Sequence, residues 1–304
     1  MTLSFFGYIP EFTFEKSFDE TQLTSSADFM RSTLHIPVLL SGLYVLVIFG
    51  LQKVMEDRPA FNLRNPLAAW SLFLGLFSLC GSVRTVPALI KMIQSKGVTE
   101  VICGDTRREW LFNNPAGFWT FIFVLSKVPE LIDTLFIVLR KRKLITLHWY
   151  HHITVMMFCW HSWGTHCLYG IFFAAMNLTV HAFMYVFYFL TALGYRPTSF
   201  AQSITILQIV QMLFGTLITF YAAFHMTFVV PQDILGSILS PKSLEWNLNI
   251  SMYVDDSPKC HVNPGNALAG ITMYTSYLWL FCVFFYYAYI HKPKPSATPA
   301  KKDN

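Results

Sequence analysis

Residues 144–163 read LITLHWYHHITVMMFCWHSW, an apolar run long enough for a membrane-spanning helix that carries three histidines near its start. Because helical residues three and four apart share a face, His148, His151 and His152 point the same way. Imidazoles inside a membrane helix are costly unless they meet polar partners or a water-filled cavity. This stretch therefore predicts a functional site inside a helical membrane protein.

Composition predicts that most of the chain lies in a membrane. Of the 304 residues 54% are hydrophobic and only 13% are charged, whereas soluble domains carry about 25% charged residues. Each apolar run supplies the roughly 20 residues that a spanning helix needs. We therefore expect an all-α polytopic membrane protein with about seven transmembrane helices. The runs lie near 35–52, 66–94, 116–139, 144–163, 168–193, 200–230 and 266–290.

Basic side chains predict the orientation of these spans. The run Arg140-Lys141-Arg142-Lys143 follows the third span, and positive charge stays on the cytoplasmic side of membranes. Seven spans then place the N-terminus in the lumen and the C-terminus in the cytosol. We expect a lumenal arm over 1–34, a transmembrane catalytic domain over 35–290 and a cytosolic tail over 291–304. No interleaved basic and aromatic module points to nucleic acid.

Two long connectors, 97–115 and 229–265, fall on the predicted lumenal side. Cys103 and Cys260 would then lie in an oxidising compartment, and we favour a disulfide between them over two unrelated free thiols. Asn249 begins an Asn-Ile-Ser sequon in the second connector, which predicts a glycosylation site.

Polar side chains recur at helical spacing in four of the spans. From the predicted cytosolic ends, at 1.5 Å per residue, all four sets fall roughly 8–18 Å deep. Four sets at one depth predict a shared chamber near the cytosolic side. The sets are Lys127, Glu130, Asp133 and Thr134; His148, His151 and His152; Asn177, His181 and Tyr185; and Thr205, Gln208 and Gln211.

Each set has a simpler interpretation. Lys127 and Glu130 would form only a structural ion pair, and the amide side chains would only join helices through hydrogen bonds. A single buried histidine is usually a satisfied core residue. Three on one face, with His181 at a matched depth, favour a functional site instead.

Imidazole can bind metal, move protons or attack carbonyls. The HxxHH spacing resembles that of membrane di-iron desaturases and hydroxylases, but few histidines lie at this depth, so a metal would have to recruit Glu130 or Asp133. A seven-helix receptor or transporter is the second alternative. No charged pathway is repeated between two halves of the chain, as it is in many transporters. The clustered histidines favour an enzyme.

The ordered set of motifs resembles the ELO family of very-long-chain fatty acid elongases, and the likeness covers essentially all seven spans. Residues 143–155 look most like the subgroup that extends saturated and monounsaturated chains. The connector 229–265 is longer than is usual in the family. The motifs are Lys127-x-x-Glu130-x-x-Asp133-Thr134, His148-x-x-His151-His152, His181-x-x-Met184-Tyr185 and Thr205-x-x-Gln208-x-x-Gln211.

The resemblance implies a 3-ketoacyl-CoA synthase, an acyltransferase that condenses a long-chain acyl-CoA with malonyl-CoA and needs no metal or other cofactor. An apolar tunnel would hold the acyl chain. In the scheme proposed for the family, His151 takes the acyl group as an acyl-imidazole. His181 and Asn177 would then stabilise the enolate left when malonyl-CoA loses CO2.

The remaining residues have supporting roles in this interpretation. His148 and His152 would orient or protonate the reacting groups. A supporting polar shell would consist of Lys127, Glu130, Asp133, Tyr185, Gln208 and Gln211. Lys141, Arg142 and Lys143 would bind the CoA phosphates at the cytosolic mouth, or would serve only as a topology signal.

The C-terminal Lys301 and Lys302 resemble a dilysine retrieval signal of the endoplasmic reticulum, although an ordinary polar tail is the alternative. We expect a multi-pass protein of that membrane. From the resemblance alone, its partners would be the ketoacyl reductase, dehydratase and enoyl reductase of the elongation cycle. A homo-oligomer is a further hypothesis.

Overall fold

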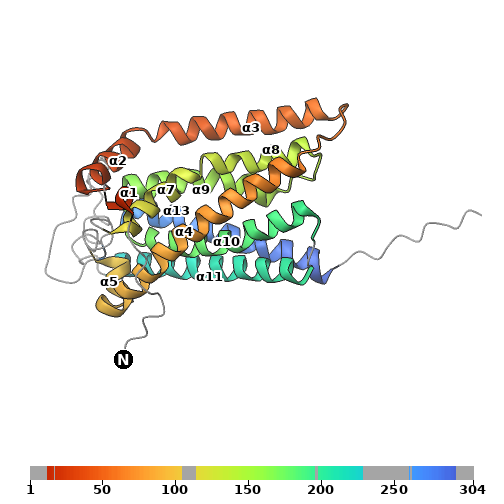
Figure 1. Cartoon of the computed structure of the whole chain (residues 1–304). Coiled ribbons are helices and arrows are strands. Elements are labelled where there is room, and N and C mark those ends of the chain that lie inside the picture. The colour runs from red at the N-terminus through yellow and green to blue at the C-terminus, as the bar shows by residue number, and fades with distance from the viewer. Residues whose placement is uncertain are drawn as a thin grey trace, which may run out of the picture.

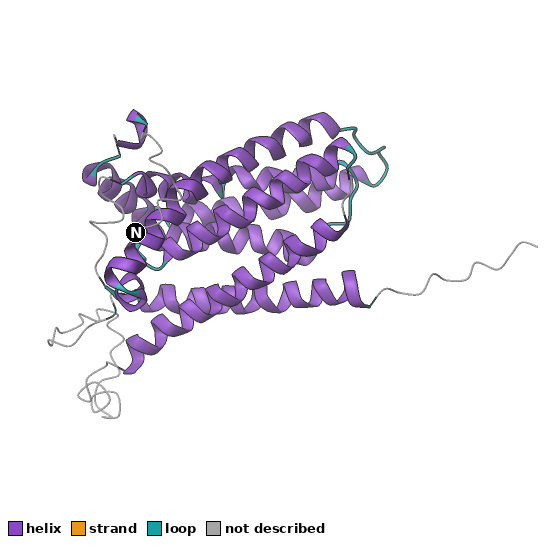
Figure 2. Cartoon of the chain, turned by 60° about the horizontal axis from the view of Figure 1, so that its bottom comes forward, coloured by secondary structure: helices purple, strands orange, loops and turns teal. Residues whose placement is uncertain are grey.

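The computed structural model describes residues 12–16, 18–104, 114–195, 198–228, 260 and 262–291. Within these ranges the regular structure is entirely helical, which confirms the predicted all-α class (Figures 1 and 2). Asn249, Lys301 and Lys302 lie outside the described residues, as does most of the connector 229–265.

The helices follow one another in a long bundle. They are α1 (Thr13–Lys16), α2 (Glu20–Ser32), α3 (His35–Met55), α4 (Arg64–Lys96), α5 (Val98–Cys103), α7 (Pro115–Ser126), η1 (Pro129–Leu131), α8 (Ile132–Leu139), α9 (Thr146–Gly164), α10 (Gly170–Leu193), α11 (Thr198–Phe228), α13 (Pro264–Phe285) and η2 (Tyr286–Ile290). In Figure 1, α1, α2 and α5 gather at one end, and the turn between α8 and α9 lies at the other.

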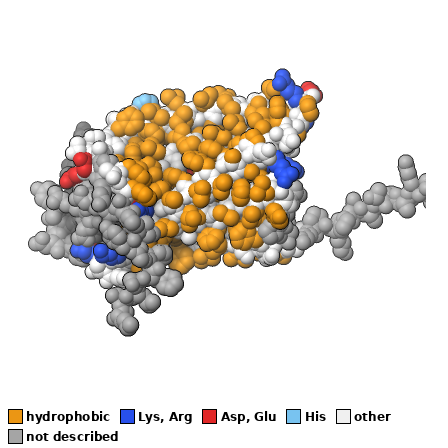
Figure 3. Space-filling model, viewed as in Figure 1, with side chains coloured by type: hydrophobic (Ala, Val, Ile, Leu, Met, Phe, Trp, Pro, Cys, Tyr) orange, Lys and Arg blue, Asp and Glu red, His pale blue; other side chains and the backbone are white. Residues whose placement is uncertain are grey.

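The flank of the bundle is built for lipid. Five helices, α3, α4, α10, α11 and α13, are long and apolar enough to cross a membrane. Hydrophobic side chains cover the flank in Figure 3, while charged ones gather toward the two ends. Leu39 and Leu46 of α3 are 67% and 73% exposed, which suits a face against acyl chains. The chain is therefore a multi-pass membrane protein, and the number seven stays a prediction.

The third expected span is broken, although its apolar run predicts a continuous helix. It comprises α7, the short turn η1 and α8. Pro129 has no amide hydrogen, and its ring would clash with a carbonyl one turn earlier in a continuous helix. The amides of Lys127 and Val128 instead bond the carbonyls three residues before them, Val124 and Leu125. The break therefore falls inside the polar motif of this span.

A disulfide between Cys103 and Cys260 joins the end of α5 to the segment that leads into α13. We call this end of the bundle the disulfide end, and the end that carries Arg140 to Lys143 the basic end. The side chains of Tyr169, Asn266 and His161 form a hydrogen-bonded cluster near the disulfide end. The Tyr169 hydroxyl donates to Asn266 Oδ1 at 2.6 Å, and the Asn266 amide lies 2.9 Å from His161 Nδ1.

The N-terminal arm is anchored by a buried carboxylate. Glu15 is 2% exposed and accepts hydrogen bonds from Arg84 Nε and Nη2, both at 2.8 Å, and from Trp119 Nε1 at 2.7 Å. Burial alone would raise the pKa of Glu15, but hydrogen bonds from Trp119, the Phe12 amide and Arg84 lower it below its ordinary value. One carboxylate thus ties α1 to α4 and α7.

We expect Glu15→Gln to lower the thermal unfolding midpoint of detergent-solubilised protein by several degrees at neutral pH. Because the folded-state pKa is lowered, the stability that the carboxylate contributes is full above the ordinary glutamate pKa and is lost as pH falls through the lowered one. The gap to wild type should therefore narrow below about pH 4. Glu20→Gln, at an exposed position of α2, is the matched control. A gap that does not change with pH would contradict this account.

Candidate active site

Members of all four polar sets line one cavity of about 620 Å³. Its wall is supplied by α4, α8, α9, α10, α11 and α13, so residues far apart in the sequence share one chamber. We call it the wide cavity. The predicted site residues that line it are His148, His151, His152, Asn177, His181, Tyr185, Asp133, Gln208 and Gln211.

A buried ion pair lies behind this wall, at the break in the third span. Lys127 Nζ is 2.7 and 3.0 Å from the two oxygens of Glu130, and both residues are at most 2% exposed. Lys127 also donates to Asn177 Oδ1 at 3.1 Å, and the Ser126 hydroxyl donates to Glu130 at 2.8 Å. The pair therefore orients the Asn177 amide and does not itself line the wide cavity.

Asp133 is held from two neighbouring helices. Trp70 Nε1 of α4 donates to Oδ1 at 2.6 Å, and the Tyr185 hydroxyl of α10 donates to Oδ2 at 2.6 Å. Both carboxylate oxygens thus have a donor. This leaves Asp133 placed to join α4, α8 and α10 at the cavity wall.

The histidines of α9 form a contiguous group. His148 Nε2 lies 3.0 Å from the Thr134 hydroxyl, which is 2.7 Å from the Tyr44 hydroxyl of α3. The rings of His148 and His152 are 4.5 Å apart between centroids. In the described part of the chain, His152 Nδ1 is buried without a hydrogen-bond partner. Because this nitrogen atom has almost no exposed surface, another part of the His152 ring faces the wide cavity.

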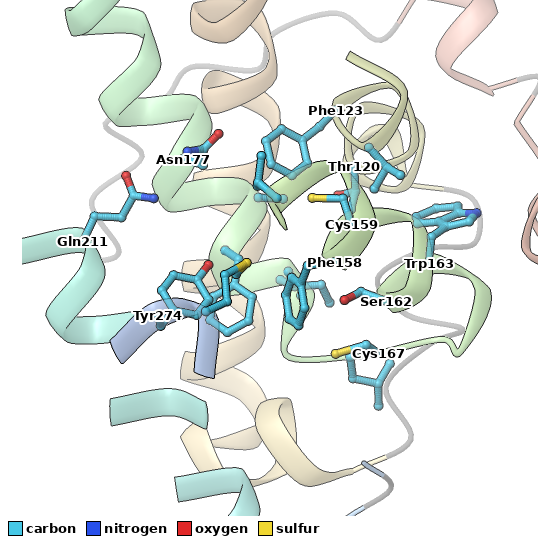
Figure 4. A pocket seen from close by; sticks show the side chains of 18 of the residues that line it. Thr120, Phe123, Phe158, Cys159, Ser162, Trp163, Cys167, Asn177, Gln211 and Tyr274 are labelled. Atoms are coloured by element: carbon cyan, nitrogen blue, oxygen red, sulfur yellow. The ribbon is translucent and has the colours of Figure 1, made fainter. Parts of the chain in front are cut away.

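A second cavity, narrow and mainly apolar, meets the wide one at His151. The two share His151, Asn177, Gln211 and Met212 in their linings. We call it the narrow cavity. Figure 4 shows Asn177 and Gln211 toward one end of it and Trp163 and Cys167 toward the other, with Phe158 and Tyr274 along its length. Tyr277 positions His151 here, because its hydroxyl donates to the His151 carbonyl at 3.1 Å.

Three predicted positions on α10 and α11 have different surroundings. Gln208 lines the wide cavity with its amide 3.4 Å from Met184 Sδ. Thr205 does not line it and instead bonds the Ala201 carbonyl at 3.1 Å, with the Tyr289 hydroxyl 3.3 Å away. His181 lies beside Tyr185, with 5.4 Å between ring centroids.

The cations expected for CoA are only partly at the mouth. Arg142 lines the wide cavity, and so does Arg140, which the sequence analysis did not select. Lys141 turns away, because its backbone has φ +53° and its Nζ donates to the carbonyls of Glu56 and Arg58 at 3.0 and 3.1 Å. Lys143 is exposed and lies outside the lining. Arg140 begins the basic run 140–143, and its membership of that run could have identified it as a cavity residue.

Potential metal ligands are engaged with other side chains. Glu130 is paired with Lys127, and Asp133 is held by Trp70 and Tyr185. Among the described residues, no group of three or more His, Cys, Asp or Glu is arranged to hold an ion.

Residues 29–297 match the ELO family, also described as the GNS1/SUR4 family. The chain belongs to the ELO family. It is 38% identical to very long chain fatty acid elongase 6 of Rattus norvegicus over 295 residues, which cover 96% of this chain and 97% of that one. The Homo sapiens protein of that name is 38% identical over 286 residues, 93% and 94% of the two chains. Fatty acid elongase 2 of Trypanosoma cruzi is 39% identical over 239 residues, 78% and 77% of the chains.

These relatives confirm the resemblance stated from the motifs. This ELO chain is a fatty acid elongase, and the desaturase-like, receptor and transporter alternatives are not favoured. The residues that match the family, 29–297, include nearly all of the described helices.

Replacing one member of the buried Lys127–Glu130 pair should lower the unfolding free energy far more than replacing both members. Lys127→Met leaves the Glu130 carboxylate uncompensated, so we expect a loss of about 3–5 kcal/mol in unfolding free energy. The double variant Lys127→Met/Glu130→Met should regain most of that loss, because no buried charge remains. SDS-induced unfolding in mixed micelles measures both, with the exposed Lys143→Met as control. Equal stability of the single and double variants would show that the pair is not a coupled unit.

Proposed function

We propose that this elongase condenses a long-chain acyl-CoA with malonyl-CoA to give a 3-ketoacyl-CoA, CO2 and CoA, with His151 as the group that accepts the acyl chain. The supporting observation is the place of His151, where the wide cavity, which carries the other predicted site histidines and two arginines, meets the narrow and mainly apolar one. An acyl-CoA has a charged half and an apolar half joined at the thioester. If each half occupies the cavity that suits it, the thioester carbon lies at His151.

The first half-reaction transfers the acyl group. A neutral ring nitrogen of His151 attacks the thioester carbonyl, the carbon–sulfur bond breaks, and CoA leaves as a thiolate that takes up the imidazole proton. The acyl chain remains on the imidazole in the narrow cavity. Arg142, with Arg140 beside it, binds CoA phosphates at the mouth of the wide cavity.

The second half-reaction makes the carbon–carbon bond. Malonyl-CoA replaces CoA and loses CO2, and the electrons of the broken bond remain as an enolate. His181 and Asn177 stabilise this enolate, the latter oriented by Lys127. The enolate carbon attacks the acyl carbonyl, and the carbon–nitrogen bond to His151 breaks. The departing ring nitrogen takes up a proton from water, which restores the neutral imidazole. No cofactor besides the two substrates takes part.

His148 and His152 lie on the same face of α9 as His151, the acyl acceptor, and support it. The Thr134 hydroxyl fixes the His148 ring, and the His148 ring packs against that of His152 with 4.5 Å between their centroids. The Lys127–Glu130 pair, Asp133, Tyr185, Gln208 and Gln211 form the polar shell that keeps these rings in place.

The same proposal includes a location. The basic end of the bundle faces the cytosol and the disulfide end faces the lumen of the endoplasmic reticulum, where the Cys103–Cys260 bridge persists. Lys301 and Lys302 act as the retrieval signal, and Asn249 as a glycosylation site. Ketoacyl reductase, dehydratase and enoyl reductase activities would consume the 3-ketoacyl product, and a homo-oligomer is compatible with this arrangement.

Purified protein incubated with palmitoyl-CoA alone should release about one CoA per chain and gain the mass of one acyl group. His151→Ala should do neither, because it lacks the attacking nitrogen. Free thiol release and intact mass are the measurements. His225→Ala is the matched control, since this histidine lies outside both cavities.

Release of CoA only after malonyl-CoA is added would contradict the acyl-imidazole and favour a ternary mechanism. Wild-type condensation by His151→Ala would contradict the role of His151 itself.

A further inference from the structure

We infer that α2, at the disulfide end, forms the floor of the narrow cavity, and that Leu23 sets the greatest acyl length the enzyme accepts. The inference rests on the proposed function, which places the acyl chain in this cavity. Leu23 is the one residue of α2 in the lining, and it is 2% exposed. The other lining residues come from α7, α9, α10, α11, α13 and the turn between α9 and α10.

The lining of the cavity extends from His151 to this floor. Its lining follows α9 from His151 to Trp163, which is about 18 Å at 1.5 Å per residue. The side chains along it are chiefly apolar and aromatic, such as Phe158 and Tyr274 (Figure 4). An acyl chain that starts at His151 therefore extends toward Trp163 and Leu23.

The floor is fixed firmly to α9. Trp163 Nε1 donates to the Ser26 hydroxyl at 3.0 Å, and Trp160 Nε1 donates to the Met30 carbonyl at 3.0 Å. In return, Arg31 Nε of α2 donates to the Gly164 carbonyl at 2.9 Å. Trp163 thus lines the cavity and also contacts α2 through its hydrogen bond to Ser26.

Close packing supports these hydrogen bonds. The buried stripe of α2 comprises Leu23, Ala27 and Met30, at the spacing of one helix face. Gly164 lets the two helices approach, because a methyl group added there would lie 3.0 Å from the Arg31 backbone nitrogen. A floor held in this way resists displacement by a longer chain.

This arrangement implies a sharp length limit. Each further methylene gains free energy by burial while apolar space remains. A methylene that reaches Leu23 must displace a packed side chain, which is unfavourable. Specificity should therefore fall steeply between the longest accepted acyl-CoA and its homologue two carbons longer.

The test compares kcat/KM for these two acyl-CoA substrates, with malonyl-CoA and full-length purified protein. Leu23→Ala should raise the ratio of the longer to the shorter substrate by roughly tenfold, the effect of burying two more methylenes. Leu23→Val should shift it in the same direction by less, and Leu23→Phe should move the limit to a shorter chain. These two milder changes keep the test valid if the alanine variant folds poorly.

Met30→Ala is the matched control. Met30 lies on the same stripe and is 1% exposed, but it does not line the cavity, so its ratio should stay at the wild-type value. An unchanged ratio in the Leu23 variants, or an equal shift in Met30→Ala, would overturn the inference while condensation itself continues. Absence of condensation by wild type with every acyl-CoA would instead refute the proposed function, and this inference with it.

Discussion

A lysine and a glutamate inside a membrane bundle are tolerated only as a hydrogen-bonded pair. Lys127 and Glu130 form such a pair where Pro129 interrupts the third span, so a backbone constraint and a charge constraint coincide. Lys127 also holds Asn177 of α10. Because His181 follows Asn177 by about one helical turn, the pair fixes the part of α10 that faces the chamber.

The polarity of the lining changes from the wide cavity to the narrow one. Histidine, amide and arginine side chains stand among apolar ones in the wide cavity, whereas aromatic and aliphatic side chains predominate in the narrow one. A ligand with one charged half and one apolar half can bind this path in a single orientation. The imidazole at the junction then meets the atom that joins the two halves, which is the geometry that acyl transfer requires.

Much of this arrangement was predictable from helical periodicity. The polar sets recur every third or fourth residue, and their matched depth predicted that His148, His151, Asn177, His181 and Gln211 would share one chamber. The pairing of Cys103 with Cys260 followed from the predicted side of the membrane. Regular helices have one period and one rise, so these inferences needed no tertiary information.

Other features depended on local backbone and on distant partners. Pro129 is visible in the sequence, but the span was expected to continue through it. Lys141 stands between two arginines of the same charge, and only its left-handed backbone turns it from the mouth. Trp70 gives no sign of its bond to Asp133. The stripe of α2 comprises only three residues in a helix of 13, so its packing on α9 required the structure.

The central claim is that the acyl chain and the CoA lie on opposite sides of His151. A structure of the full-length protein with a thioether analogue of palmitoyl-CoA, which cannot undergo acyl transfer, tests it directly. We expect the sulfur beside His151, the alkyl chain along Phe158 and Tyr274, and the CoA phosphates near Arg142. An alkyl chain that leaves the wide cavity toward lipid, with the narrow cavity empty, would contradict the account.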